Sequence, residues 1–191
     1  MMNTFSDFFA TYGFLSKEVI SDIDNISVNI SFPANELILT AGSTSKDIYL
    51  IVNGAARLYY YSEGKEITNQ FFFEGEIIAD MESMYSKKRS NYNIQLLEHC
   101  DLIKIRYSAL EKLYQQYHDL ESIGRKLAIE CFLEENERNR SYQIQTAKER
   151  YQSLIKKHPN ILNRINLGHI ASYIGITQVQ LSRIRSELFS F

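Results

Sequence analysis

The residues best suited to chemistry lie near the end of the chain, from Thr177 onward. The run Thr177-Gln178-Val179-Gln180 is a capping box, in which the Thr and Gln side chains can satisfy free backbone groups at a helix start. The side chains expected to face outward there are Thr177, Gln178, Val179, Ser182, Arg183 and Arg185. Arg can pair with guanine, Gln with adenine, and Val can contact a thymine methyl. This set is suited to reading the edges of DNA bases.

The residues around that helix complete a buried pattern. Asn166 is suited to cap a short helix over residues 167–174, and Gly175 stands where the chain must reverse, a position that favours a left-handed φ. The inward positions are Leu167, Ile170, Ala171, Ile174, Ile176, Leu181, Ile184 and Leu188. Small Ala171 lets the second helix approach the first. The spacing is that of a DNA-binding helix-turn-helix, and the alternative is a helical hairpin that contacts only protein.

The charge of the chain is divided unevenly between this segment and the rest. The formal net charge is −2, but residues 1–144 hold 14 Lys and Arg against 21 Asp and Glu, a net of −7. Residues 145–191 hold 7 against 2, a net of +5. A basic segment on an acidic body indicates a nucleic-acid-binding tail, with chance clustering as the alternative. We expect Arg164, Lys156, Lys157 and Arg185 to contact DNA phosphates.

The preceding part of the chain predicts strands. Runs rich in β-branched and aromatic residues occupy 28–32, 37–39, 48–52, 55–61, 67–73, 93–97 and 102–105. Turn residues such as Pro33, Gly42, Asn53-Gly54 and Gly75 separate them at intervals of about ten residues, as in an antiparallel sandwich or barrel. Ser62-Glu63-Gly64-Lys65 is predicted to be a hairpin tip. One or two short helices, with Ser16 as a cap, are expected over residues 5–25.

After Tyr107 the apolar period becomes helical. A short helix is expected over residues 110–117, followed by a long helix over 118–144. Its narrow apolar stripe consists of Leu120, Ile123, Leu127, Ala128, Cys131 and Phe132, and Glu134 and Arg138 are placed for an i,i+4 ion pair. The stripe is a candidate dimer seam, or it packs on its own sheet domain. Thr146-Ala147-Lys148-Glu149 is a second capping box, whose helix should end near His158-Pro159.

Composition excludes several classes of protein. With 45% hydrophobic residues and 2 prolines, the chain is neither disordered nor a Pro-rich linker. No apolar run suggests a membrane span or a secretion signal, so we expect a cytoplasmic protein with no membrane partner. Cys100 and Cys131 cannot form a metal quartet, and no enzyme constellation emerges, so neither catalytic residues nor a metal site is predicted.

At this point the chain resembles the Crp/Fnr superfamily of transcription regulators, most closely its short Bacteroidetes-type members. The similar stretches are residues 32–42, 48–58, 63–66, 75–80 and 169–185. The resemblance implies an α+β fold with an N-terminal antiparallel β-roll like a cyclic-nucleotide-binding domain (1–117), a long dimerisation helix (118–144) and an all-α helix-turn-helix domain (145–191). Family members often add a β-hairpin wing after the recognition helix, for which this chain has no room before Phe191.

The resemblance also locates an effector pocket, with departures from the family pattern. Nucleotide-binding members use Gly-Glu on the ribose and Arg-Ser on the cyclic phosphate. The corresponding residues here are Ala79-Asp80, and either Ser90-Asn91 or, with a shorter loop, Arg89-Ser90. A hydroxyl pair on the long helix is replaced by Glu135-Asn136. The expected pocket is Ala79, Asp80, Met81, Arg89, Ser90, Asn91, Glu135 and Asn136.

No cofactor is therefore assigned. The phosphate-binding arginine is shifted or absent, which argues against tight binding of a cyclic phosphate. The pocket is expected to hold a cyclic nucleotide, another small molecule or nothing. An iron–sulfur cluster is excluded by the two cysteines.

The resulting expectation is a homodimeric regulator that binds palindromic promoter DNA and contacts RNA polymerase, with half-sites about 34 Å apart. The alternatives are a ligand-independent DNA binder, and a cyclic-nucleotide-binding-like module whose helical tail binds a protein partner.

Overall fold

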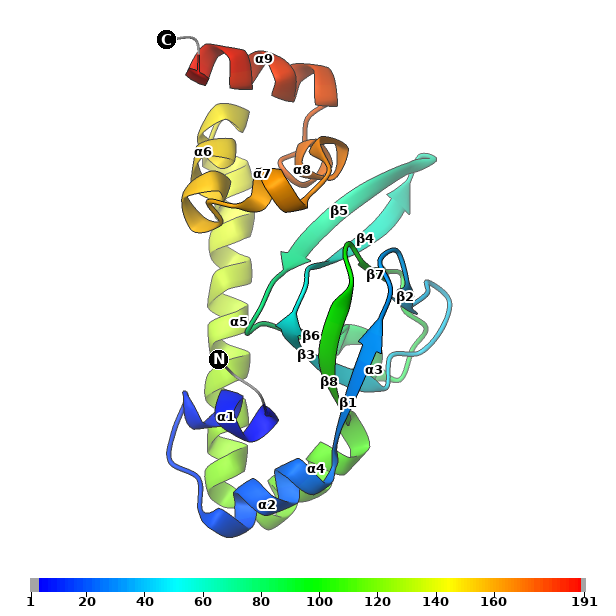
Figure 1. Cartoon of the computed structure of the whole chain (residues 1–191), viewed down its shortest axis with the longest axis vertical. Helices are drawn as coiled ribbons and strands as arrows, with labels where there is room; N and C mark the ends of the chain where they lie inside the picture. Colours follow the sequence, from blue (N-terminus) through cyan, green and yellow to red (C-terminus); the bar gives the residue numbers. More distant parts are fainter. Residues whose placement is uncertain (1–3, 190–191) are drawn as a thin grey trace.

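Two antiparallel four-stranded sheets pack into a β-roll in the computed structural model, which describes residues 4–189 (Figure 1). One sheet has the strand order β1-β8-β3-β6 and the other β2-β7-β4-β5. The strands are β1 (Ser27–Phe32), β2 (Leu37–Leu39), β3 (Asp47–Asn53), β4 (Ala56–Ser62), β5 (Lys65–Phe72), β6 (Ile77–Ile78), β7 (Asn93–Leu96) and β8 (Cys100–Arg106). The expected antiparallel roll is confirmed.

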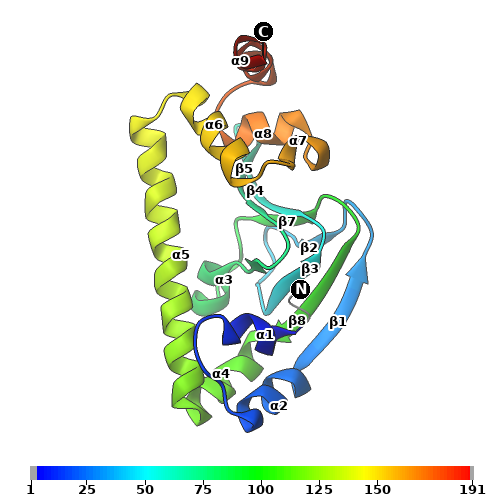
Figure 2. The ribbon, with the colours of Figure 1, turned by 60° about the vertical axis from the view of Figure 1, so that its left-hand side comes forward.

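Helices flank the roll at both ends. They are α1 (Phe5–Ala10), α2 (Lys17–Asn25), α3 (Met81–Ser86), α4 (Tyr107–Gln116), α5 (His118–Ile144), α6 (Ala147–Lys157), α7 (Ile161–Arg164), α8 (Leu167–Tyr173) and α9 (Gln178–Phe189). The 27-residue α5 runs alongside the roll and carries α6–α9 at its far end (Figures 1 and 2). The predicted caps Ser16 and Thr146 are confirmed, as is the end of α6 before Pro159.

The predicted hairpin tip is also confirmed. Ser62 pairs with Lys65, and both turn residues have positive φ, Glu63 at 50° and Gly64 at 76°. The sequence pattern did not predict β6, α3 or α7, which span two, six and four residues. The buried side chain of Asp80 caps α3 by accepting from the Ser83 N–H at 3.1 Å.

The long helix is buried at its start and exposed in its middle. Leu120 and Ile123 pack with α1, α2 and α4 in one apolar cluster, and Leu127 lies at its edge. Farther along, Ile129, Phe132 and Leu133 are exposed, Phe132 at 63%. Arg138 pairs with Glu135 rather than with the expected Glu134, because its guanidinium is drawn toward β5. The first part of the apolar stripe therefore packs on its own domain, and the exposed part stays a candidate dimer seam.

The C-terminal helices share a core with the roll. Ala55, Phe71 and Phe73 of the roll belong to the same buried cluster as the inward residues of α6–α9. The Phe71 and Tyr173 rings are 5.1 Å apart, and the Phe73 and His158 rings 4.4 Å. Burial of this area stabilises the attachment of the helical unit to the sheets. Within residues 4–189, no helix is both long and apolar enough to cross a membrane.

Candidate nucleic-acid interface

The turn between α8 and α9 follows the predicted geometry. Gly175 has φ +76°, and its N–H donates to the Ser172 carbonyl at 3.1 Å. Asn166 caps α8 by accepting from the Gly168 N–H at 2.7 Å. At the start of α9, the Thr177 hydroxyl accepts from the Gln180 N–H at 3.2 Å while the Gln180 amide accepts from the Thr177 N–H at 2.9 Å. These contacts satisfy the free backbone groups at the two helix starts and at the turn.

The inward side of the pair is closely packed. Ile170, Ala171, Ile174 and Leu181 are all buried, and Leu181 has no exposed surface. The Ile176 N–H donates to the Ala171 carbonyl at 3.0 Å, so the turn approaches the first helix at its smallest side chain. The packing fixes α9 relative to α8.

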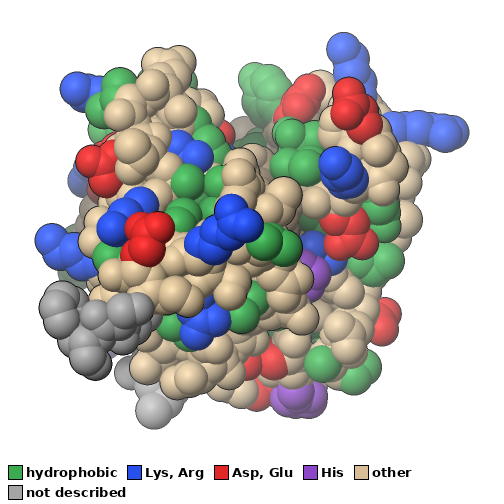
Figure 3. Space-filling model, turned by 90° about the horizontal axis from the view of Figure 1, so that it is seen from above, with side chains coloured by type: hydrophobic (Ala, Val, Ile, Leu, Met, Phe, Trp, Pro, Cys, Tyr) green, Lys and Arg blue, Asp and Glu red, His purple; other side chains and the backbone are tan. Residues whose placement is uncertain are grey.

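The outward side presents the residues predicted to read DNA. Thr177, Gln178, Val179, Ser182 and Arg183 are exposed, Val179 at 65%. They lie on the first turns of α9, at the end of the molecule shown from above in Figure 3. Lys and Arg side chains protrude there, with Asp and Glu between them. The arrangement offers amide, hydroxyl and guanidinium groups to a groove.

Several other basic residues of this segment contact partners within the protein. Arg185 is half-buried beside Tyr151, and Lys148 pairs with Glu187 at 3.3 Å. Arg164 was expected to contact phosphates, but it forms ion pairs with Glu74 and Glu98 of the roll. Lys156 and Lys157 are exposed. The net charge of +5 thus overstates the cations that face solvent near α9.

Arg150, which the sequence did not single out, fastens the helical unit to the end of α5. Its Nε and Nη2 donate to the Ile174 carbonyl at 3.1 and 2.9 Å, and its Nη1 donates to the Gln145 carbonyl at 2.6 Å. The guanidinium lies 4.9 Å from the Tyr142 ring, and the Tyr142 hydroxyl donates to the Tyr173 carbonyl. In the sequence, Arg150 contributes only to the net charge of residues 145–191.

A second unpredicted arginine joins the roll to α8. Arg57 on β4 is 3% exposed and donates to Gln95 at 2.9 Å, to Glu66 at 2.5 Å and to Nδ1 of His169 at 2.9 Å. Nδ1 therefore accepts, so His169 is neutral in this contact. Burial, and then the charge of Arg57, lower the pKa of His169 below its usual 6.5. In the sequence, an arginine within the apolar run 55–61 was the signal that could have predicted a buried, paired cation.

Beside it, the Ser172 hydroxyl connects α8 to β5. It accepts from the Thr68 N–H at 2.9 Å and donates to the Glu66 carbonyl at 2.9 Å.

The expected effector residues divide into buried and exposed groups. Asp80 and Ser90 are buried and satisfied within the roll: Asp80 caps α3, and the Ser90 hydroxyl donates to the Tyr92 carbonyl at 3.1 Å and accepts from its N–H at 2.9 Å. Ala79 is partly buried and packs against the apolar cluster that includes Leu120 and Ile123. The exposed members are Met81, Arg89, Asn91 and Asn136, and Glu135 is half-buried.

The surroundings of these residues do not fit a cyclic phosphate. Arg138, which is largely buried, donates from Nη1 to the Asn69 carbonyl at 2.6 Å and also contacts Glu135. Burial raises the pKa of the Tyr92 hydroxyl, with further contributions from nearby Glu82, Tyr60, Asp80 and Glu135. An anion would therefore meet negative charge and an arginine already bound.

A cavity of about 410 Å³ lies elsewhere, at the edge of the sandwich. Its lining includes Leu39, Tyr49, Ile94 and Arg106, together with residues 43–47. Burial, followed by the charge of Asp47, raises the pKa of Tyr49 to about 12, so this hydroxyl is a neutral donor. None of the expected effector residues lines this cavity.

Comparison with protein families gave a match over the roll. Residues 29–117 match the family described as the cyclic nucleotide-binding domain. Comparison with curated proteins gave no match.

Similar solved structures cover most of the chain. FixK2 from Bradyrhizobium japonicum is 20% identical, with a TM-score of 0.71 over 86% of this chain and 85% of that one. A putative Crp/Fnr-family transcriptional regulator from Eubacterium rectale is 16% identical, with a TM-score of 0.71 over 91% and 84%. The c-di-GMP-responsive global regulator CLP of Xanthomonas campestris is 15% identical, with a TM-score of 0.68 over 92% of both chains. At these identities the likeness establishes a shared fold.

Proposed function

We propose that this chain, which carries a cyclic nucleotide-binding domain at residues 29–117 and has the fold of Crp/Fnr regulators, is a transcriptional regulator that binds DNA as a homodimer. The observation that carries the proposal is the exposed, capped start of α9. There Gln178, Val179, Ser182 and Arg183 stand clear of the protein while the opposite side of the helix is buried. Such a helix can enter the major groove while its opposite side stays packed on the protein.

The middle of α5 supports the dimer. Ile129, Phe132 and Leu133 are 50%, 63% and 59% exposed and, at positions i, i+3 and i+4, form an apolar patch on one face of the helix. A second copy of α5 would cover it and bring two α9 helices to one side of the DNA, as a palindromic site requires. RNA polymerase is the further partner that we propose, because a regulator bound at a promoter lies beside the polymerase on the DNA.

Substitution in α5 tests the dimer. Phe132→Glu places a charge in the apolar seam and should give a monomer in analytical ultracentrifugation, with loss of binding to palindromic DNA. Val28→Glu is the matched control, because Val28 is similarly exposed on β1, away from α5. A Phe132→Glu chain that stays dimeric would refute the seam.

A salt titration tests DNA binding. The affinity for random duplex DNA should fall linearly in log–log terms as salt increases, since each neutralised phosphate releases counterions. A flat response would exclude phosphate neutralisation and favour a tail that binds a protein partner.

The roll is proposed to act without a cyclic nucleotide. Arg138 is bound to Asn69 and Glu135, and Asp80 is buried as a helix cap, which leaves a cyclic phosphate without a free buried cation among the described residues of the pocket. Calorimetry with cyclic AMP and cyclic GMP should give no heat of binding, while DNA binding persists without either. Micromolar binding of one nucleotide would restore the ligand-dependent alternative.

A further inference from the structure

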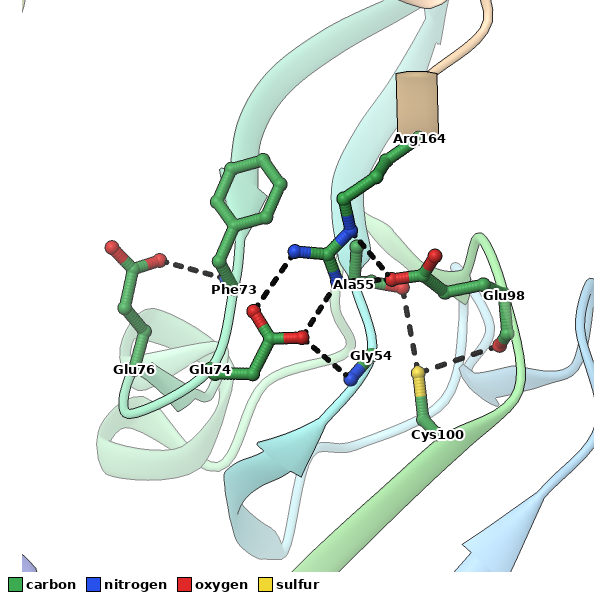
Figure 4. A network of polar contacts seen from close by, with 8 residues as sticks. All are labelled: Gly54, Ala55, Phe73, Glu74, Glu76, Glu98, Cys100 and Arg164. Carbon is green, nitrogen blue, oxygen red and sulfur yellow. Dashed lines mark hydrogen bonds and ion pairs between the residues drawn. The ribbon is translucent and has the colours of Figure 1, made fainter. Parts of the chain in front are cut away.

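Among the contacts between the helical unit and the roll is an arginine held by two carboxylates. Arg164, at the end of α7, donates from Nη1 and Nη2 to the two carboxylate oxygens of Glu74 at 2.9 and 2.7 Å. Its Nε donates to Glu98 at 3.0 Å. Figure 4 shows the guanidinium between the two carboxylates, which come from different loops of the roll. A bidentate fork of this kind fixes orientation as well as distance.

The roll holds both acceptors in place. An oxygen of Glu74 also accepts from the Gly54 N–H at 3.0 Å. Gly54 has φ +112°, and a Cβ there would lie 2.4 Å from the Cys100 sulfur, so only glycine brings this N–H to the carboxylate. The Cys100 thiol in turn contacts the Glu98 and Ala55 carbonyls at 3.4 and 3.5 Å (Figure 4). The fork is therefore anchored in the sandwich.

The covalent link to α5 is much less restrictive. Between α5 and α6 lie Gln145 and Thr146, both in extended conformation, so rotation there would swing α6–α9 as a unit. The Arg150 clamp lies beside this joint, whereas the Arg164 fork acts on the other side of the unit and meets residues far away in the sequence. A contact distant from a hinge constrains rotation more than one beside it.

From this arrangement we propose that Arg164, Glu74 and Glu98 are positioning residues that fix the angle of α9 relative to α5. In the dimer they would thereby set the half-site spacing that the protein accepts. The spacing rests on the proposed function, since it presupposes a DNA-binding dimer. The inference about the orientation of α9 depends only on the geometry of the fork.

The test compares DNA sites that differ only in spacing. Duplexes selected from a random pool by the wild-type chain are remade with one or two base pairs added or removed between the half-sites. Arg164→Gln, Arg164→Lys and the double variant E74Q/E98Q should each lose about tenfold in discrimination between spacings, the factor of one strong contact. Their affinity for an isolated half-site should be unchanged.

Lys148→Gln is the matched control. It makes the same charge change as Arg164→Gln and breaks an ion pair, Lys148–Glu187, that lies wholly within the helical unit. Its spacing profile should match wild type. Arg164→Lys keeps the charge and loses the fork, so a wild-type profile for this variant would overturn the positioning role.

A measurement without DNA separates the two proposals. Amide hydrogen exchange in α8 should accelerate in the Arg164 and E74Q/E98Q variants and not in Lys148→Gln. Unchanged exchange would overturn the inference whatever the DNA result. If exchange accelerates but the wild-type chain binds no DNA, the proposed function and the spacing fail, and the fork stands as an orienting contact.

Discussion

The outer and inner sides of the C-terminal helical unit use the same residue types for opposite purposes. On the outer side Arg183 is exposed at the start of α9, beside other side chains that can reach bases. On the inner side Arg164 is held by two glutamates and Arg57 meets His169, next to a shared apolar cluster. Charge counting cannot distinguish these arginines, because desolvation and acidic partners rather than the charge itself decide what an arginine does.

The largest effect should come from the packed side of α9. Leu181→Ala removes a side chain with no exposed surface and should destabilise the protein by about 2–5 kcal/mol through the lost burial and the cavity left behind. Chemical denaturation measures this. Val179→Ala on the outer side should change the free energy of unfolding by less than about 0.5 kcal/mol. Equal losses for the two would contradict the division into sides.

The next effect separates recognition from stability. Arg183→Ala should cost about 1–3 kcal/mol of DNA binding and relax the preference at one base pair of each half-site. Fluorescence anisotropy on single-base variants of the selected site measures both. Arg89→Ala, an exposed arginine on the roll, is the control. An unaltered base preference in Arg183→Ala would refute its role in reading DNA.

The inner side should respond to acid through Glu74. Its hydrogen bonds with Arg164, offset in part by burial, lower the pKa of this carboxyl to about 2 from the usual 4.5. Because the folded pKa is depressed, the stabilisation is full above pH 4.5 and is lost as the pH falls from 4.5 toward 2. In Arg164→Gln the pKa of the Glu74 carboxyl should rise toward 4.5, as measured by NMR titration. A value near 2 in that variant would show that Arg164 is not the cause.

The smallest effect should appear at the α8 contact with the roll. Because burial and Arg57 depress the pKa of His169, the folded state binds fewer protons than the unfolded state just below pH 6.5. Stability is therefore full above pH 6.5 and falls as the pH drops through the folded-state pKa. Thermal unfolding from pH 7 to 5 measures this slope. His169→Gln should flatten it, and an unchanged slope would assign the proton to another group.

Prediction from sequence succeeded where structure follows from local pattern. The hairpin at Gly64, the capping box at Thr146 and the turn at Gly175 each depend on residues within a few positions of one another. Arg138 shows the limit, because its carbonyl partner Asn69 lies on β5 and no pairing rule along a helix selects it. Asp80, one of the expected effector residues, shows a second limit, because it caps a short helix that the pattern did not predict.

The sequence by itself determined the antiparallel roll, the long helix and the buried side of the helix-turn-helix, since periodic burial and caps are short-range consequences of residue type. The tertiary structure decided which charges remain free. It brought Arg164 to Glu74 and Glu98, Arg57 to His169, and Phe71 to Tyr173. These partners lie far apart in the chain and meet only because the helical unit folds back onto the sheets, where burial favours paired charges and covered rings.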